Sequence, residues 1–198
     1  MNQRFAWVIS GLVVLFLSVY YFVVLARPIS LNLVNAVVAF SSTFVIGFSF
    51  LLGPLARLTG FFRPLLSLRK PFGLIGFGLA ALHALLVVPV QLGNMREIGL
   101  GDVASLVFAG MAFMVFTLMS LTSTQNWMEK LGYENWKNLQ RTGYLAFAFV
   151  LFHIVLLEHG VFLSRTTGQF AIAFILLCFF LRALLLFLAK PNTEKINI

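Results

Sequence analysis

Six long apolar segments constrain this chain more than any other feature of its sequence. They cover residues 6–26, 31–53, 72–92, 103–123, 143–163 and 169–189. Each is close to the roughly 20 residues that a helix needs to cross the hydrocarbon core of a membrane. With 61% hydrophobic and 10% charged residues, the composition lies outside that of soluble globular domains. The sequence therefore predicts an all-α integral membrane bundle of six transmembrane helices, forming a single domain over residues 1–198.

Basic residues divide the connecting segments into two unequal groups. On one side of the predicted membrane the loops carry only Arg27, Arg96 and Arg165. Because positive charge is enriched in cytoplasmic loops, we expect both termini in the cytoplasm, most simply at a bacterial plasma membrane. The net charge of +8 lies in short loops, so it indicates contact with membrane lipid and not with nucleic acid. The richer side carries Arg4, Arg57, Arg63, Arg69, Lys70, Lys130, Lys137, Arg141, Lys190 and Lys195.

Two longer loops lie on the predicted cytoplasmic side. Residues 54–71 contain prolines at positions 54, 64 and 71, so we expect this loop to be broken into short pieces. Residues 124–142 combine mixed charge with three aromatic residues. That combination is typical of a short helix anchored in the membrane interface. The aromatic residues are Trp127, Tyr133 and Trp136.

Two histidines lie deep inside predicted helices, where an ionisable side chain indicates a functional site. His83 follows Pro71 by 12 residues, which places it about 18 Å into the membrane. His153 follows Thr142 by 11 residues, or about 16 Å. Two neutral imidazoles at matched depth on parallel helices suit bis-histidine ligation of a haem iron. The alternative is that each ring makes a polar contact with a neighbouring helix.

The residues around the two histidines leave two interpretations open. Gly76 and Ala80 share the face of His83, with Gly73 and Gly78 nearby. Small residues in membrane helices favour close helix packing, and they also leave room for a flat macrocycle. The face of His153 presents an apolar wall with gaps, formed by Ala146, Phe149, Leu157 and Gly160.

Two stretches share ordered motifs with a known family. The first is RKPFGL at 69–74 followed by AALH at 80–83; the second runs from LTST at 121–124 through KLG at 130–132 and WKNL at 136–139 to Tyr144-Leu145 and His153. Together they resemble the ferric reductase-like transmembrane domain, and most closely the haem-binding membrane subunit of the bacterial methionine sulfoxide reductase system. The resemblance covers about residues 69–153. It implies a b-type haem with His83 and His153 as axial ligands of the iron.

One position departs from that family's pattern. Where the family has Leu-His-Arg, this chain has Leu139-Gln140-Arg141. An amide is a poor iron ligand compared with imidazole, so we expect one haem and no second haem on the cytoplasmic side. His159 could act as a substitute ligand, but beside Glu158 it is more simply interpreted as half of an interfacial ion pair. Arg182, in the sixth segment, is expected to extend its charge towards the membrane surface, with contact to a haem propionate as the alternative.

The resemblance implies a function that requires partners. No soluble stretch is long enough for a flavin or nicotinamide domain, so the electron donor would be a separate molecule. We expect an oxidoreductase subunit that passes electrons from a cytoplasmic-side quinol or flavin across the bilayer to an outer acceptor or a soluble reductase subunit. The alternative is a non-redox membrane protein, a permease or assembly partner, with structural histidines. The candidate quinone or flavin site, whose residues could also act only as topology determinants, consists of Arg69, Lys70, Trp136, Lys137 and Arg141.

Overall fold

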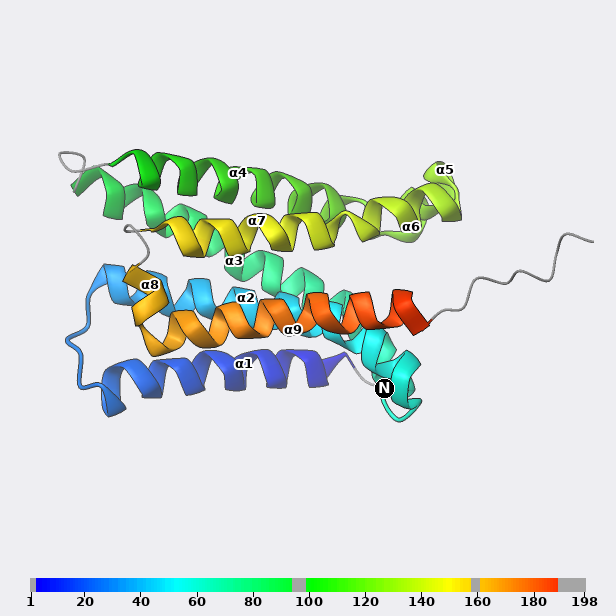
Figure 1. Ribbon diagram of the computed structural model, residues 1–198, viewed down its shortest axis with the longest axis horizontal. Helices are drawn as coiled ribbons and strands as arrows, with labels where there is room; N and C mark the ends of the chain where they lie inside the picture. Colours follow the sequence, from blue (N-terminus) through cyan, green and yellow to red (C-terminus); the bar gives the residue numbers. More distant parts are fainter. Residues whose placement is uncertain (1–2, 94–98, 158–160, 189–198) are drawn as a thin grey trace, which may run out of the picture.

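A computed structural model describes residues 3–93, 99–157 and 161–188, and within these ranges it contains helices and no strands (Figure 1). Six helices in the described ranges are long and apolar enough to cross a membrane, which confirms the predicted all-α, multi-pass membrane fold. The long elements are α1 (Arg4–Val19) with its π-helical continuation η1 (Tyr20–Val24), α2 (Leu31–Thr59), α3 (Arg69–Gly93), α4 (Leu100–Leu121), α7 (Gly143–Leu156) and α9 (Thr166–Leu188). The short elements are the 3₁₀-helix η2 (Arg63–Leu68), α5 (Gln125–Leu131), α6 (Tyr133–Arg141) and α8 (Val161–Ser164).

Helix α2 is the central element of the bundle. It packs against α1, α3 and α9, while α4 packs mainly against α7 (Figure 1). Fully buried side chains such as Phe147, Ile175 and Cys178 fill the space between α2, α7 and α9. The outer faces of the other long helices expose large apolar side chains, as expected for surfaces in contact with lipid.

The bundle has two distinct ends. Helix α1 begins and α9 ends at the end that also carries η2, α5 and α6, on the right of Figure 1. We call it the terminal end, and the other the distal end. The six spans therefore return the chain to the side on which it started. The assignment of the terminal end to the cytoplasm stays a prediction from the loop charges.

The second helix is longer than the sequence indicated. A loop was expected from Pro54, but α2 continues through this proline to Thr59 and ends at Gly60, whose φ of +69° suits glycine. Proline has no N–H to offer the carbonyl four residues earlier, that of Phe50. The hydroxyl of Tyr144 donates to this carbonyl at 3.5 Å. A side chain from α7 thus supplies part of the bonding that proline removes, which makes the proline tolerable within a membrane helix.

The fifth helix is shorter than the sequence indicated. Instead of running over 143–163, α7 ends at Leu156, and His153 lies in its last turn and not halfway along. The expected interfacial helix over 124–142 is two short helices, α5 and α6, divided at Gly132 with φ of +74°. Only Thr142 separates α6 from α7.

Candidate haem site

His83 from α3 and His153 from α7 face each other. Their ring centroids are 6.4 Å apart, and the ring planes are inclined by 54°. The approach that was predicted from matched depth is therefore confirmed, although the two histidines are 70 residues apart in the chain.

The ring of His83 is held by a polar residue of the central helix. Its Nδ1 lies 2.7 Å from Oδ1 of Asn35, which is almost fully buried in the second turn of α2. An amide oxygen accepts a hydrogen bond, so Nδ1 carries the proton and the lone pair of the neutral ring lies on Nε2.

The ring of His153 is held in the same way by a residue of α4. Its Nδ1 lies 2.8 Å from Oγ and 3.1 Å from the carbonyl oxygen of Ser105, whose side chain is fully buried. The Ser105 hydroxyl donates in turn to the carbonyl of His153 at 3.0 Å. Both oxygens thus accept from Nδ1–H, and the lone pair is again on Nε2.

These contacts create the arrangement that an axial ligand pair needs. Each ring makes its described hydrogen bonds through Nδ1, with Nε2 unused, and an N–H held by an outer partner is the usual state of a metal-bound histidine. Two histidine–metal bonds of about 2 Å each, collinear between the rings, place the ring centroids about 6 Å apart. The observed 6.4 Å fits one metal ion between the two rings.

The surrounding ligand set favours haem over a bare metal ion. Among the described residues no group of three or more His, Cys, Asp or Glu side chains is placed to hold a metal. A protein-bound zinc ion takes three or four protein ligands, whereas haem supplies four equatorial nitrogens of its own and needs only two axial side chains. Two histidines, with no further acidic or thiol ligand among the described residues, therefore fit a haem iron.

Pairs of phenylalanines join the helices that carry the histidines to α4. Phe77 of α3 stacks on Phe113 of α4 at 5.6 Å, and Phe108 of α4 contacts both Phe149 and Phe152 of α7. These contacts provide apolar walls of the kind that a macrocycle requires.

The nearby glycines serve helix packing. A Cβ added at Gly76 would lie 2.5 Å from the Ile46 side chain and 2.8 Å from its backbone nitrogen, so Gly76 allows α3 to approach α2. Gly73 is likewise near Ser49, whereas Gly78 has nothing within 4 Å. Of the two interpretations left open by the sequence, close helix packing is the one that applies to Gly76. This close approach also brings His83 to Asn35.

The histidine site lies towards the distal end. Asn35 and Ser105 are in the second turn of helices that begin there, and His153 is in the last turn of a helix that ends there. His159 and Glu158 lie outside the described residues.

Sequence reasoning missed Asn35 and Ser105. A signal was present, since both are polar residues inside apolar segments. What the sequence lacks is the rotation of each helix about its axis, which decides whether such a residue faces a histidine or a lipid.

The five residues of the predicted quinone or flavin site have separate partners. Arg69 donates from Nε to the carbonyl of Ser49 at 3.0 Å, on α2. The residues of α6 bond elsewhere: Trp136 to the Thr122 carbonyl at 2.9 Å, Lys137 to Glu134 at 3.4 Å, and Arg141 to Asn138 at 3.0 Å. Lys70 is exposed beside Arg69. No described contact joins Arg69 or Lys70 to the three residues of α6.

Gln140 has a structural role at the end of α4. Its Nε2 donates to the carbonyl of Met119 at 3.2 Å, while Trp136 donates to that of Thr122. The last carbonyls of a helix have no partner within the helix, so these two side chains of α6 satisfy part of the α4 terminus.

Two comparisons relate the chain to known proteins. The family model described as "Ferric reductase like transmembrane component" matches residues 34–151, more than half of the chain. The match includes Asn35, His83 and Ser105 and stops two residues before His153. The magnetosome protein MamZ of Magnetospirillum gryphiswaldense is 32% identical over 110 residues. This alignment covers 52% of the chain but only 16% of MamZ, so the chain spans a small part of that relative's length. By the extent of the family match, the chain belongs to the ferric reductase-like transmembrane family.

Proposed function

We propose that the chain is a membrane electron-transfer subunit that binds one b-type haem through His83 and His153. The observation that carries the proposal is the opposition of the two rings at 6.4 Å with both Nδ1 atoms already bonded. Family membership supports membrane electron transfer in general, and the ring geometry supports this particular ligand pair.

The residues of the chain position and insulate such a group. A bound haem supplies a one-electron iron couple. Asn35 and Ser105 hold the Nδ1 side of each ring, which leaves the Nε2 lone pair of each ring for the iron. The phenylalanines of α3, α4 and α7 would give such a group apolar surroundings, and a low-dielectric shell is one of the factors that set a redox potential.

The direction of transfer follows from the predicted topology. In the proposal, a quinol or flavin at the terminal, cytoplasmic end donates electrons, and an acceptor or soluble reductase subunit takes them at the distal end. The resemblance to the methionine sulfoxide reductase membrane subunit suggests the kind of partner, a soluble reductase outside the membrane.

The experiment is the absorption spectrum of the purified protein before and after dithionite. We expect b-type bands that sharpen on reduction in the wild-type protein, and their loss in both His83→Ala and His153→Ala. His159→Ala is the matched control, because it removes the remaining histidine and should leave the bands unchanged. Full bands in either of the first two variants would refute the ligand assignment.

A non-redox function is the second candidate, because the same hydrogen bonds also hold helices together. Asn35–His83 links α2 to α3, and Ser105–His153 links α4 to α7. A permease or assembly partner that uses the histidines in this way would show no haem bands, so the same spectrum separates the two functions.

A further inference from the structure

At the terminal end the structure gathers three arginines from three helices around one tyrosine. Arg57 of α2 and Arg182 of α9 lie close enough to Arg69 of α3 for their charges to act on it, and all three act on Tyr144 of α7. The guanidinium of Arg182 lies 5.5 Å from the Tyr144 ring centroid. We call these three arginines the arginine cluster.

Among the described residues, the arginine cluster has no acidic partner within ion-pair distance. The ion pair described at this end joins Lys137 to Glu134 and includes none of the three guanidinium groups. Like charges repel one another, to an extent that depends on how far water screens them. An anion bound among the three guanidiniums would offset this repulsion.

The cluster is open to its surroundings at the level where lipid headgroups lie. Arg57 and Arg69 are exposed and Arg182 is half-buried. Helix α2 has 29 residues and is about 43 Å long, which exceeds the ~30 Å hydrocarbon core. Arg57 is in the last turn of α2, and the long α2 therefore carries it beyond the hydrocarbon.

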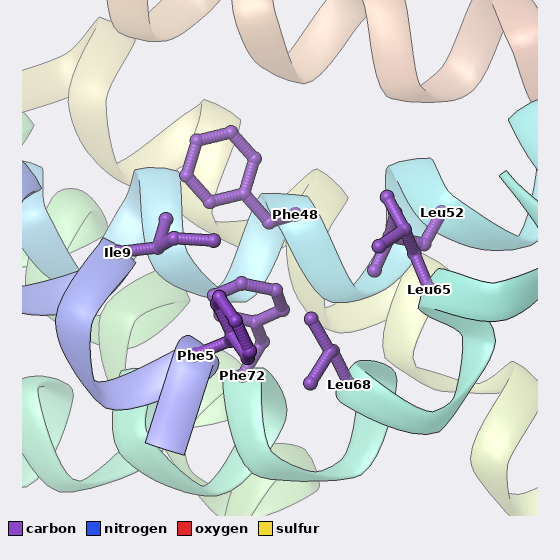
Figure 2. A pocket seen from close by; sticks show the side chains of 7 residues that line it. All are labelled: Phe5, Ile9, Phe48, Leu52, Leu65, Leu68 and Phe72. Carbon is purple, nitrogen blue, oxygen red and sulfur yellow. The ribbon is translucent and has the colours of Figure 1, made fainter. Parts of the chain in front are cut away.

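An apolar pocket lies directly beside the cluster. It has a volume of about 360 Å³ and is lined by seven apolar side chains from α1, α2, η2 and α3, which converge on one space (Figure 2). Leu52 and Leu68 line this pocket. The residues that follow them in the chain, Gly53 and Arg69, contact each other. There the Arg69 guanidinium carbon is 3.4 Å from where a Gly53 Cβ would stand. The charged and apolar parts thus meet at one junction of α2 and α3.

We propose that this junction is a binding site for one anionic phospholipid. The arginine cluster takes the phosphodiester, because guanidinium groups bind phosphate oxygens through paired, charge-assisted hydrogen bonds. The apolar pocket takes the first part of an acyl chain. A small soluble anion would use the arginines alone, so the adjoining pocket is what selects a lipid. The site is independent of haem, and it would exist in either of the two candidate functions.

The test is native mass spectrometry of the full chain in detergent, titrated with phosphatidylglycerol or with phosphatidylcholine of the same acyl chains. We expect one tightly retained phosphatidylglycerol per chain. Arg57→Gln and Arg182→Gln should each weaken its binding about five-fold, from roughly 1 kcal/mol per basic residue near an anionic headgroup. Leu65→Trp, which fills the pocket without changing the charge, should weaken the binding of both lipids.

Lys70→Gln is the matched control. It removes one charge next to Arg69 but outside the cluster, and it should change affinity less than two-fold. Equal binding of the two lipids would overturn the proposal, as would an equal loss in Lys70→Gln, since net charge alone would then explain the result. Repeating the titration on His83→Ala separates this proposal from the haem assignment, because lipid binding should persist there.

Discussion

The two ends of the bundle handle ionisable side chains in opposite ways. At the distal end, His83 and His153 are each bonded to a neutral oxygen-bearing residue, which leaves one nitrogen per ring unused. At the terminal end, the arginine cluster has no carboxylate within ion-pair distance among the described residues. The two ends are therefore suited to different ligands. Neutral, oriented lone pairs suit a metal ion, whereas unpaired cations suit an anion.

Reporter fusions that test which end faces the cytoplasm should give the largest effect, because each reporter is either active or inactive. A reporter fused after Ile198 should be active only if it works in the cytoplasm. A reporter placed in the 93–102 loop should be active only if it works outside. The reverse pattern would place the terminal end outside and the histidine site on the cytoplasmic side.

Gly76→Ala should disrupt helix packing at the histidine site, because it separates α3 from α2. The added methyl would meet the Ile46 backbone at 2.8 Å, so the backbone must shift, at a cost of about 1–3 kcal/mol. We expect a lower unfolding temperature in detergent and weaker haem bands. Gly78→Ala, with nothing within 4 Å, is the control and should change stability by less than about 1 kcal/mol. If the two variants behave alike, Gly76 does not hold the helices in contact.

Substitution of the two outer partners should give unequal effects. Asn35→Leu removes the described acceptor of His83 Nδ1, and loss of such a partner typically weakens metal binding about 10–100-fold. Ser105→Ala leaves the Ser105 main-chain carbonyl, at 3.1 Å, to accept from His153, so its effect should be less than about tenfold. The rate of haem transfer to an acceptor globin measures both. A larger effect in Ser105→Ala would show that the hydroxyl, and not the carbonyl, holds the ring.

Gln140→Ala should have the smallest effect. It removes one hydrogen bond at the end of α4, worth about 1 kcal/mol, and no iron ligand. Thermal unfolding should detect the loss, while the absorption spectrum stays as in the wild-type protein. Gln125→Ala, which removes only a surface bond to Glu129, is the control. A changed spectrum in Gln140→Ala would mean that this amide lies at a haem after all.

Apolar length and residue spacing predicted the six spans and the meeting of His83 with His153. Both depend on the rise per residue, which is nearly constant in a helix. The course of α2 through Pro54 could not be predicted, because the compensating hydroxyl of Tyr144 is 94 residues from the Phe50 carbonyl to which it donates. The end of α7 at Leu156 was missed because apolar residues continue beyond it.

The contacts that side chains make between helices could also not be predicted from the sequence. Arg57, Arg69 and Arg182 stand on three helices, and only the packing of α2, α3 and α9 brings them together. The same holds for Asn35 and Ser105, each 48 residues from its histidine. Charge counts predicted which loops are basic, but not which basic residues form a cluster.

The measurement that tests the central claim most directly is the number of haems per chain, by the pyridine haemochrome method on the purified wild-type protein. The proposal assigns one iron to the one pair of opposed histidines, whose rings are 6.4 Å apart, and therefore predicts a ratio of one. The His83→Ala/His153→Ala double variant should give zero. A wild-type ratio near two would require a second ligand pair, and a wild-type ratio of zero, or haem retained by the double variant, would contradict the account.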